Sequence, residues 1–163
     1  MQLSSEVTMM QAIVVSHTRS KTMTTETNIA LVRRWIEAGW NAHNTALIDT
    51  LYTQNVVQHD PNSPLPVTSS EALKHYVGGF LTAFPDIHFT IDDLLAEGDK
   101  VLWRFTAQAT HTGPLMTIPP SGERTTVTGM VLFRVANDRI AEVWVNFDAL
   151  GMLQAIGVVP AMA

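Results

Sequence analysis

The sequence contains no cysteine, which excludes disulfide bonds, thiolate nucleophiles and thiolate metal sites. Charged residues are also scarce, at 15% of the 163 residues, against about 25% in an average soluble protein. No basic run is longer than Arg33-Arg34, and the net charge is −5, so the chain lacks the footprint of a nucleic-acid-binding protein. No apolar stretch approaches the roughly 18 residues of a membrane-spanning helix. We therefore expect a soluble, cytoplasmic protein that binds neither nucleic acid nor membrane.

Recognisable metal and cofactor motifs are missing as well. The histidines at positions 17, 43, 59, 75, 88 and 111 never recur at a helical spacing of three or four, and no His-x-His occurs. The glycine-rich patterns of dinucleotide and phosphate sites are absent, as is the Gly-x-Ser-x-Gly motif of serine hydrolases. We expect no metal and no cofactor, which leaves general acid/base chemistry or simple ligand binding.

Hydrophobic residues are plentiful, at 46% of the chain, which is enough for one sizeable core. Residues 1–26 differ from the rest because they are rich in Ser, Thr and Met and show no sustained period. We interpret this segment as a flexible N-terminal extension, with a translation start at Met23 as the alternative. The remaining residues, 27–163, are predicted to form a single domain.

The hydrophobic pattern of this domain changes from helical to alternating along the chain. Ile29, Val32, Ile36 and Trp40 recur at spacings of three and four, which indicates an amphipathic helix that Thr25 or Thr27 would cap. The later segments alternate between apolar and polar residues, as strands do. The predicted order is helices at 27–40, 45–51 and 70–84, an extended piece at 56–61, strands at 87–95, 100–112, 125–135 and 140–147, and a helix at 150–156. This order is typical of an α+β fold with helices on one side of a curved antiparallel sheet.

Three side chains are candidates for moving a proton. His59 follows an extended apolar pair, and an unperturbed imidazole titrates near neutrality; its alternative role is that of a half-buried loop residue bonded to the backbone. Asp60 precedes Pro61 and also fits an Asx turn. His111 lies in Thr-His-Thr-Gly at a strand end, where it could instead stabilise the turn.

Other polar and aromatic residues have structural explanations beside functional ones. Arg104 lies mid-strand on the polar register, where pairing with Glu142 is the expected structural role. Trp103 and Trp144 would serve equally as pocket walls or as core. Asp148 precedes the last helix and is most simply its N-cap, with catalysis as the alternative.

An ordered series of short motifs carries a family resemblance. The pieces are His59-Asp60-Pro61, Phe84-Pro85-Asp86, Gly98-Asp99-Lys100-Val101, Arg104-Phe105, Thr110-His111-Thr112-Gly113, Ile118-Pro119-Pro120-Ser121-Gly122, Arg139 through Trp144, and Asp148 through Gly157. Taken together, from about Thr27 to Gly157, they resemble the SnoaL-like polyketide cyclase (ester cyclase) family of the nuclear-transport-factor-2-like (NTF2-like) superfamily.

This resemblance implies an NTF2-like cone-shaped barrel, in which a strongly bent antiparallel sheet wraps around helices and encloses an apolar cavity. It also implies a homodimer formed through the outer face of the sheet. In the cyclases an aspartate removes a proton next to a carbonyl, and an intramolecular aldol condensation follows without metal or cofactor. Burial suits this chemistry because it raises the pKa of a carboxyl group toward neutrality.

The site residues of the cyclases carry over incompletely. In the register that Ile140, Asp148 and Gly151 set, the cyclase aspartate falls on Val145, and a supporting histidine falls on Val131. Neither valine can move a proton, so the fold alone does not license the aldol mechanism. The predicted catalytic residues are therefore His59 first, then Asp60 and His111. The predicted substrate-binding residues are Trp103, Arg104, Val131, Phe133, Trp144, Val145, Asn146 and Phe147, with Asn146 also a reserve proton-transfer group.

Three functions remain open at this point. The first is a cyclase or isomerase that acts on a polyketide-like, terpenoid or other cyclic ketone or ester in a hydrophobic cavity. The second is a non-catalytic module that binds a small apolar molecule, for which Val131 and Val145 argue. The third is activation of water on an epoxide, which needs a buried Asp-Arg-Asp constellation of which only Arg104 is evident.

Overall fold

The computed structural model describes residues 24–161. The predicted extension at 1–26 and the alternative start at Met23 therefore fall largely outside the described residues. Helix α2 (Thr25–Arg34) continues directly into a π-helical segment, η1 (Trp35–Trp40). The cap of α2 is Thr24, not Thr25 or Thr27, because the extended Thr24 accepts a hydrogen bond from the backbone N–H of Thr27 at 3.2 Å.

The single helix predicted at 45–51 is divided into two short helical elements. A 3₁₀ turn, η2 (Thr45–Leu47), leads into the short α3 (Ile48–Leu51), and strand β1 (Tyr52–His59) starts immediately afterwards. Helix α4 (Ser70–Ala83) follows the proline-rich loop and is capped by Ser69, whose hydroxyl accepts from the Ala72 N–H at 3.1 Å.

Four long strands and a final helix complete the chain: β2 (His88–Glu97), β3 (Lys100–Thr110), β4 (Arg124–Ala136), β5 (Arg139–Phe147) and α5 (Ala149–Ala155). The strand order is β1-β5-β4-β3-β2. Strands β2 to β5 form the predicted antiparallel meander, but β1 pairs parallel with β5. The expectation of an entirely antiparallel sheet is thus wrong at this edge. The chain reaches β1 through helices rather than a hairpin, so antiparallel pairing is not imposed there.

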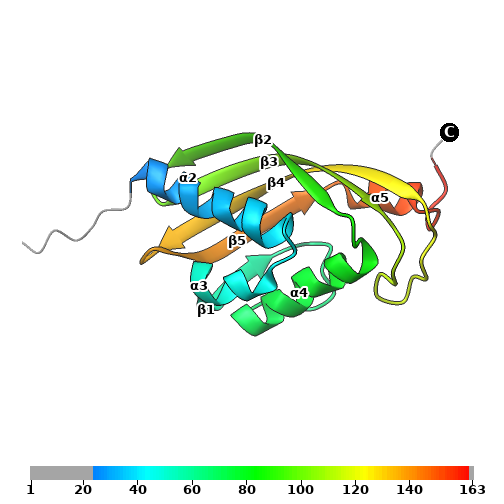
Figure 1. Cartoon of the computed structure of the whole chain (residues 1–163), viewed down its shortest axis with the longest axis horizontal. Coiled ribbons are helices and arrows are strands. Elements are labelled where there is room, and N and C mark those ends of the chain that lie inside the picture. The colour runs from blue at the N-terminus through cyan, green and yellow to red at the C-terminus, as the bar shows by residue number, and fades with distance from the viewer. Residues whose placement is uncertain (1–23, 162–163) are drawn as a thin grey trace, which may run out of the picture.

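The α+β class, with helices on the concave side of a strongly curved sheet, is confirmed. Figure 1 shows α2 and α4 lying across one face of the curved sheet, whose edge strands β1 and β2 do not pair with each other. Asp148 caps α5, as predicted, through a 2.8 Å hydrogen bond from the Gly151 N–H. None of the described helices combines the length and hydropathy needed to cross a membrane.

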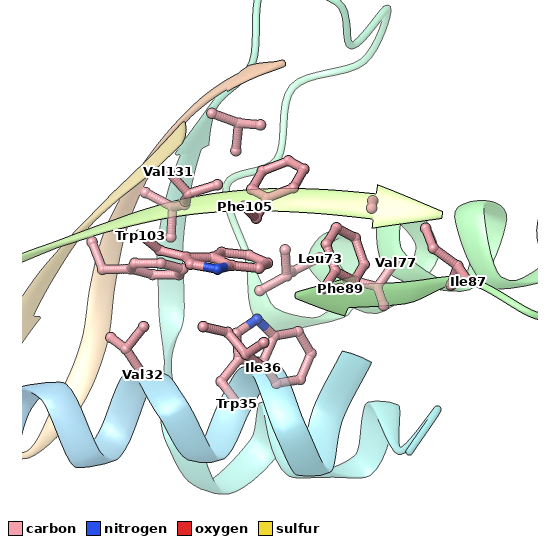
Figure 2. Close-up of a cluster of buried hydrophobic side chains, with 14 of the residues drawn as sticks. Val32, Trp35, Ile36, Leu73, Val77, Ile87, Phe89, Trp103, Phe105 and Val131 are labelled. Carbon is pink, nitrogen blue, oxygen red and sulfur yellow. The ribbon is translucent and has the colours of Figure 1, made fainter. Parts of the chain in front are cut away.

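The core lies between the helices and the inner face of the sheet. On β3 every second residue from Val101 to Ala109 is buried, which is the alternation expected of a sheet with one covered face. Trp103 is 2% exposed and lies centrally in the cluster, between the Trp35 and Ile36 side chains of the helix and Val131 of β4 (Figure 2). The inner face of the sheet and the apolar helix faces therefore bound the space in which a site can form.

Candidate functional site

An apolar pocket occupies the space between the helices and the concave face of the sheet. The space between its side chains amounts to about 810 Å³, a figure that includes the part open to solvent. It is lined by Trp35, Trp40, Tyr52, Gln58, Leu73, Tyr76, Val77, Phe80, Phe84, Ile87, Phe89, Trp103, Phe105, Ala107, Ala109, Thr125, Val127, Val131, Phe133, Val143, Val145, Phe147 and Met152. The predominance of aromatic and aliphatic side chains suits an apolar ligand.

Several predicted substrate-binding residues are in this lining. They are Trp103, Val131, Phe133, Val145 and Phe147. All of them lie on the inward-facing register of β3, β4 or β5. Gly129 on β4 leaves room for the Phe105 ring in this wall, because a Cβ at that position would come within 2.5 Å of the ring. The pocket wall is thus built from alternate residues of each strand, and the residues between them lie on the outer face of the sheet.

The other three predicted binding residues, Arg104, Trp144 and Asn146, do not line the pocket. Each falls on the opposite register of its strand, so its side chain projects from the outer face of the sheet. Arg104 does not pair with Glu142; its guanidinium contacts Asp93 at 2.6 Å and Asp92 at 3.5 Å. This Asp-Arg-Asp cluster is partly exposed and outside the pocket, so it does not form the buried constellation required for epoxide opening.

His59 also lies away from the pocket. It is the register partner of Trp144 on β5, and its ring stacks on that indole with centroids 5.3 Å apart. Its Nε2 is 2.9 Å from one carboxylate oxygen of Glu142, and the other oxygen of that carboxylate accepts from Arg134 at 3.0 Å. The hydrogen bond from His59, followed by that from Arg134, lowers the pKa of Glu142. The strand alternation places Gln58 inward and His59 outward, which corrects the expectation of His59 as a group facing the cavity.

Asp60 has two hydrogen-bonding roles. One carboxylate oxygen accepts from the Asn62 N–H at 2.9 Å, which is the Asx turn predicted as its structural role. The other accepts from the phenol of Tyr76 at 2.6 Å. Tyr76 lies on α4 and lines the pocket. Burial, and secondly the bond to Asp60, raise the pKa of Tyr76, so this phenol holds its proton at neutral pH.

The sequence pattern does not single out Tyr76 or Gln58. Tyr76 falls on the apolar stripe of its helix, and Gln58 lies next to the titratable His59. A signal did exist, since the hydroxyl of a tyrosine on a buried helix face needs a hydrogen-bond partner. Its partner Asp60 is 16 residues away, on the far side of a proline-rich loop, so no local spacing could have shown the pair.

Three pocket-lining residues each have a buried polar atom without a partner among the described residues. The atoms are Gln58 Nε2, Trp103 Nε1 and Thr125 Oγ1. The Gln58 amide also lies close to the Tyr76 phenol, where it acts on the pKa in the opposite sense to Asp60. Buried donors of this kind are suited to receive oxygen atoms of a ligand.

His111 is fully buried at the end of β3 but is not among the pocket-lining residues. Its Nδ1 accepts from the Ser121 N–H at 3.2 Å, and its backbone bonds to Glu123 and Gly122. These contacts close the loop between β3 and β4, which is the turn-stabilising role predicted as its alternative. Within residues 24–161, no group of three His, Asp or Glu side chains is arranged to hold a metal ion.

Comparisons with known proteins agree with this architecture. A model of the SnoaL-like polyketide cyclase family matches residues 30–156. AclR of Streptomyces galilaeus, a candidate hydroxylase, is 26% identical, with a TM-score of 0.75 over 86% of this chain and 87% of AclR. IdmH of Streptomyces antibioticus, a candidate polyketide cyclase, is 27% identical, with a TM-score of 0.68 over 80% of this chain and 99% of IdmH.

A third solved structure supports the fold alone. It is a candidate SnoaL-like polyketide cyclase from Jannaschia sp. CCS1, 22% identical, with a TM-score of 0.77 over 83% of this chain and 95% of its own. No curated protein sequence matches the chain. The similarity therefore extends over most of the chain, at identities that leave the site residues free to differ.

Proposed function

The chain belongs to the SnoaL-like polyketide cyclase family, and from this premise we propose that it is a cofactor-free cyclase or isomerase. Its substrate is a small, largely apolar ketone or ester of polyketide-like character, bound in the pocket between sheet and helices. The reaction begins with transfer of a proton from carbon next to a carbonyl group. The family membership supports the reaction class, and the apolar lining of the pocket supports the substrate class.

The observation that carries this proposal is the hydrogen bond between Tyr76 and Asp60. A phenol in the wall of an apolar pocket, bonded at 2.6 Å to a carboxylate behind it, is a short path for a proton. Val131 and Val145 occupy the positions of the histidine and the aspartate of the cyclases. The proton chemistry of this chain is therefore assigned to a different wall of the same pocket.

The proposed step moves two protons and one electron pair. The Tyr76 oxygen takes a proton from the substrate carbon while its own hydrogen passes to Asp60. The electron pair of the broken C–H bond moves to the carbonyl oxygen, and the enolate that forms accepts a hydrogen bond from Gln58 Nε2. Return of the proton to another carbon completes an isomerisation. Attack of the enolate on a second carbonyl of the same molecule completes a ring closure.

The test is exchange of the acidic hydrogens of 2-tetralone, a two-ring ketone, in D₂O, followed by proton NMR. We expect the protein to accelerate exchange above the buffer rate, and Tyr76→Phe to remove about 100-fold of that acceleration or more. Tyr52→Phe is the matched control, because Tyr52 is also a buried, pocket-lining phenol but has no carboxylate partner among the described residues. Equal losses in both variants would refute the assignment.

A second candidate function is binding without catalysis. The valines at positions 131 and 145 favour it, as does the placement of His59 on the outer face of the sheet. In that case 2-tetralone would bind, its exchange would stay at the buffer rate, and Tyr76→Phe would change neither. The exchange experiment thus separates the two functions directly.

We also propose that the chain forms a homodimer through the outer face of the sheet. Apolar side chains lie on that face, including the half-exposed Met130 and the register partners Leu132 and Trp144. The low share of charged residues supports a covered surface. Light scattering coupled to size-exclusion chromatography would test this: Leu132→Glu should convert a dimer to a monomer, and a monomeric wild-type protein would refute it.

A further inference from the structure

The first helix changes its hydrogen-bond pattern where it reaches the pocket. At the end of η1 the Asn41 N–H donates to the Ile36 carbonyl at 3.0 Å, five residues back. The Asn44 N–H donates to the Gly39 carbonyl at 2.8 Å, again over five residues. Each bond spans one residue more than in an α-helix. Such π turns are rare and frequently lie at functional sites, and this one borders the pocket.

The π turn places two tryptophans on the same side of the helix. Trp35 and Trp40 are five residues apart, which in an α-helix would separate them by about 140° around the axis. With hydrogen bonds over five residues they lie about one turn apart instead. Both line the pocket, and their ring centroids are 6.0 Å apart. One helical turn therefore supplies two indole walls to the pocket.

These two indoles join rings of the sheet to form an aromatic end of the pocket, which consists of Trp35, Trp40, Phe89 and Trp103. The ring centroid of Phe89 is 5.1 Å from that of Trp40 and 5.3 Å from that of Trp103. Figure 2 shows the Trp35 side chain reaching from the helix toward Trp103 and Phe89. The Asn41 amide fixes the helix to β2 here, because it donates to the Phe89 carbonyl at 2.9 Å and accepts from the Phe89 N–H at 2.8 Å. Helix and strand therefore hold the aromatic end together.

Gly39 is required by the Trp35 ring and not by the backbone. Its φ is outside the left-handed region, within a helical segment where alanine is normally the more stable residue. A Cβ at position 39, however, would overlap Cε3 and Cζ3 of the Trp35 indole. Trp35 is 2% exposed and packs edge-on against Tyr52, so the pocket is the open space into which its ring can move. A larger residue at position 39 therefore makes the aromatic end smaller.

We propose that Gly39, through the π turn and the Trp35 ring, sets the size of the substrate that the pocket accepts. The glycine leaves the aromatic end large enough for a two-ring ketone, and a bulkier residue there restricts the pocket to ketones of a single ring. Tyr76 belongs to a separate group of rings, with Phe80 5.2 Å away and Phe147 6.2 Å from Phe80. Gly39 thus determines size without contact to the proton-transfer group. This role rests on the proposed function only in that the pocket is the substrate site.

The experiment compares a two-ring ketone, 2-tetralone, with a one-ring ketone, cyclohexanone, by NMR titration. Gly39→Ala should weaken 2-tetralone binding about tenfold and cyclohexanone binding by less than about twofold, because only the larger molecule needs the space that the displaced ring takes. The matched control is Gly79→Ala, since Gly79 lies in α4 and a Cβ there would meet nothing within 4 Å. This control should change neither affinity.

Trp35→Phe distinguishes this role from a general loss of packing. Phenylalanine lacks the six-membered ring of the indole, to which Cε3 and Cζ3 belong, so Gly39→Ala should have little effect in that background. We expect the double variant to bind 2-tetralone within about twofold of Trp35→Phe alone. Equal losses for both ketones in Gly39→Ala, an unchanged 2-tetralone affinity, or no recovery in the double variant would overturn the role of Gly39.

Trp35→Phe alone tests the same end in the opposite direction, even if Gly39→Ala does not fold. The smaller ring enlarges the aromatic end, so the benzo-fused, three-ring analogue of 2-tetralone should gain about fivefold in affinity relative to 2-tetralone. An unchanged ratio would overturn the proposal. Every readout is binding, so a protein that shows this size selectivity without accelerating exchange contradicts the proposed reaction and leaves the role of Gly39 standing. A wild-type protein that binds neither ketone would contradict both.

Discussion

Val131 and Val145 are register partners on β4 and β5, and both side chains line the pocket. The family resemblance implies a histidine and an aspartate of the cyclases at these two positions. In this chain the two positions pair across the strands as an aliphatic contact. The absence of a charge at this point makes this part of the sheet wall apolar.

A carboxylate introduced into this aliphatic pair should destabilise the protein. Val145→Asp places a carboxyl group in a position that is 9% exposed, and should lower the free energy of unfolding by about 3 kcal/mol. Adding Val131→His should recover part of this loss, because the new side chains lie directly opposite each other. Urea denaturation measures both. Asn146→Asp, on the outer face of the same strand, is the control and should change stability by less than about 0.5 kcal/mol.

Asp60 is predicted to be essential to turnover and dispensable for structure. Asp60→Asn keeps an oxygen that can accept from the Asn62 N–H, but the amide cannot take up the proton that Tyr76 releases. We expect the rate constant for 2-tetralone exchange to fall about 100-fold with little change in KM. Full activity in this variant, with an unchanged circular dichroism spectrum, would contradict the relay.

His59 is predicted to be dispensable for turnover, despite being the first candidate from the sequence. Its side chain contacts Glu142 and Trp144 on the outer face and does not reach the pocket. His59→Ala should leave exchange kinetics unchanged and reduce stability by at most about 1 kcal/mol, as expected for an exposed ion pair. The exchange rates of His59→Ala and Tyr76→Phe should be measured together. Comparable losses of rate in the two variants would show that His59 takes part in the reaction.

Asp86 should make stability depend on pH in the acidic range. Its carboxylate accepts from the Thr110 hydroxyl and from the Thr110 N–H, both at 2.7 Å, and these bonds lower its pKa below the ordinary 3.8. A lowered folded-state pKa contributes stability that is complete above the unfolded-state value and is lost as pH falls through the folded-state value.

The stability difference between wild type and Asp86→Asn should therefore be constant above about pH 5 and shrink below it. Thermal denaturation at a series of pH values measures the difference, with Asp138→Asn as a control at another exposed aspartate. A difference that grows as the solution is acidified would show that the hydrogen bonds do not favour the charged form.

The class and order of the elements could be predicted because they depend on local pattern. The stripe from Ile29 to Trp40 and the alternation from Val101 to Ala109 each specify which face of an element is buried, whatever it packs against. The same alternation places Trp103, Phe133 and Phe147 on the face of the sheet that lines the pocket. The cap at Asp148 and the Asx turn at Asp60 could also be predicted from the sequence, since each involves residues only two or three apart.

What the sequence by itself determined is thus the fold, the apolar inner wall, and the presence of aliphatic side chains at positions 131 and 145. Tertiary structure alone decided which polar groups reach that wall. Side chains only one residue apart on a strand point to opposite faces, so whether Gln58 or His59 faces the pocket depends on how β1 pairs with β5. The bond between Tyr76 and Asp60 likewise exists only because α4 folds back over the end of that strand, which brings together two groups that no spacing along the chain relates.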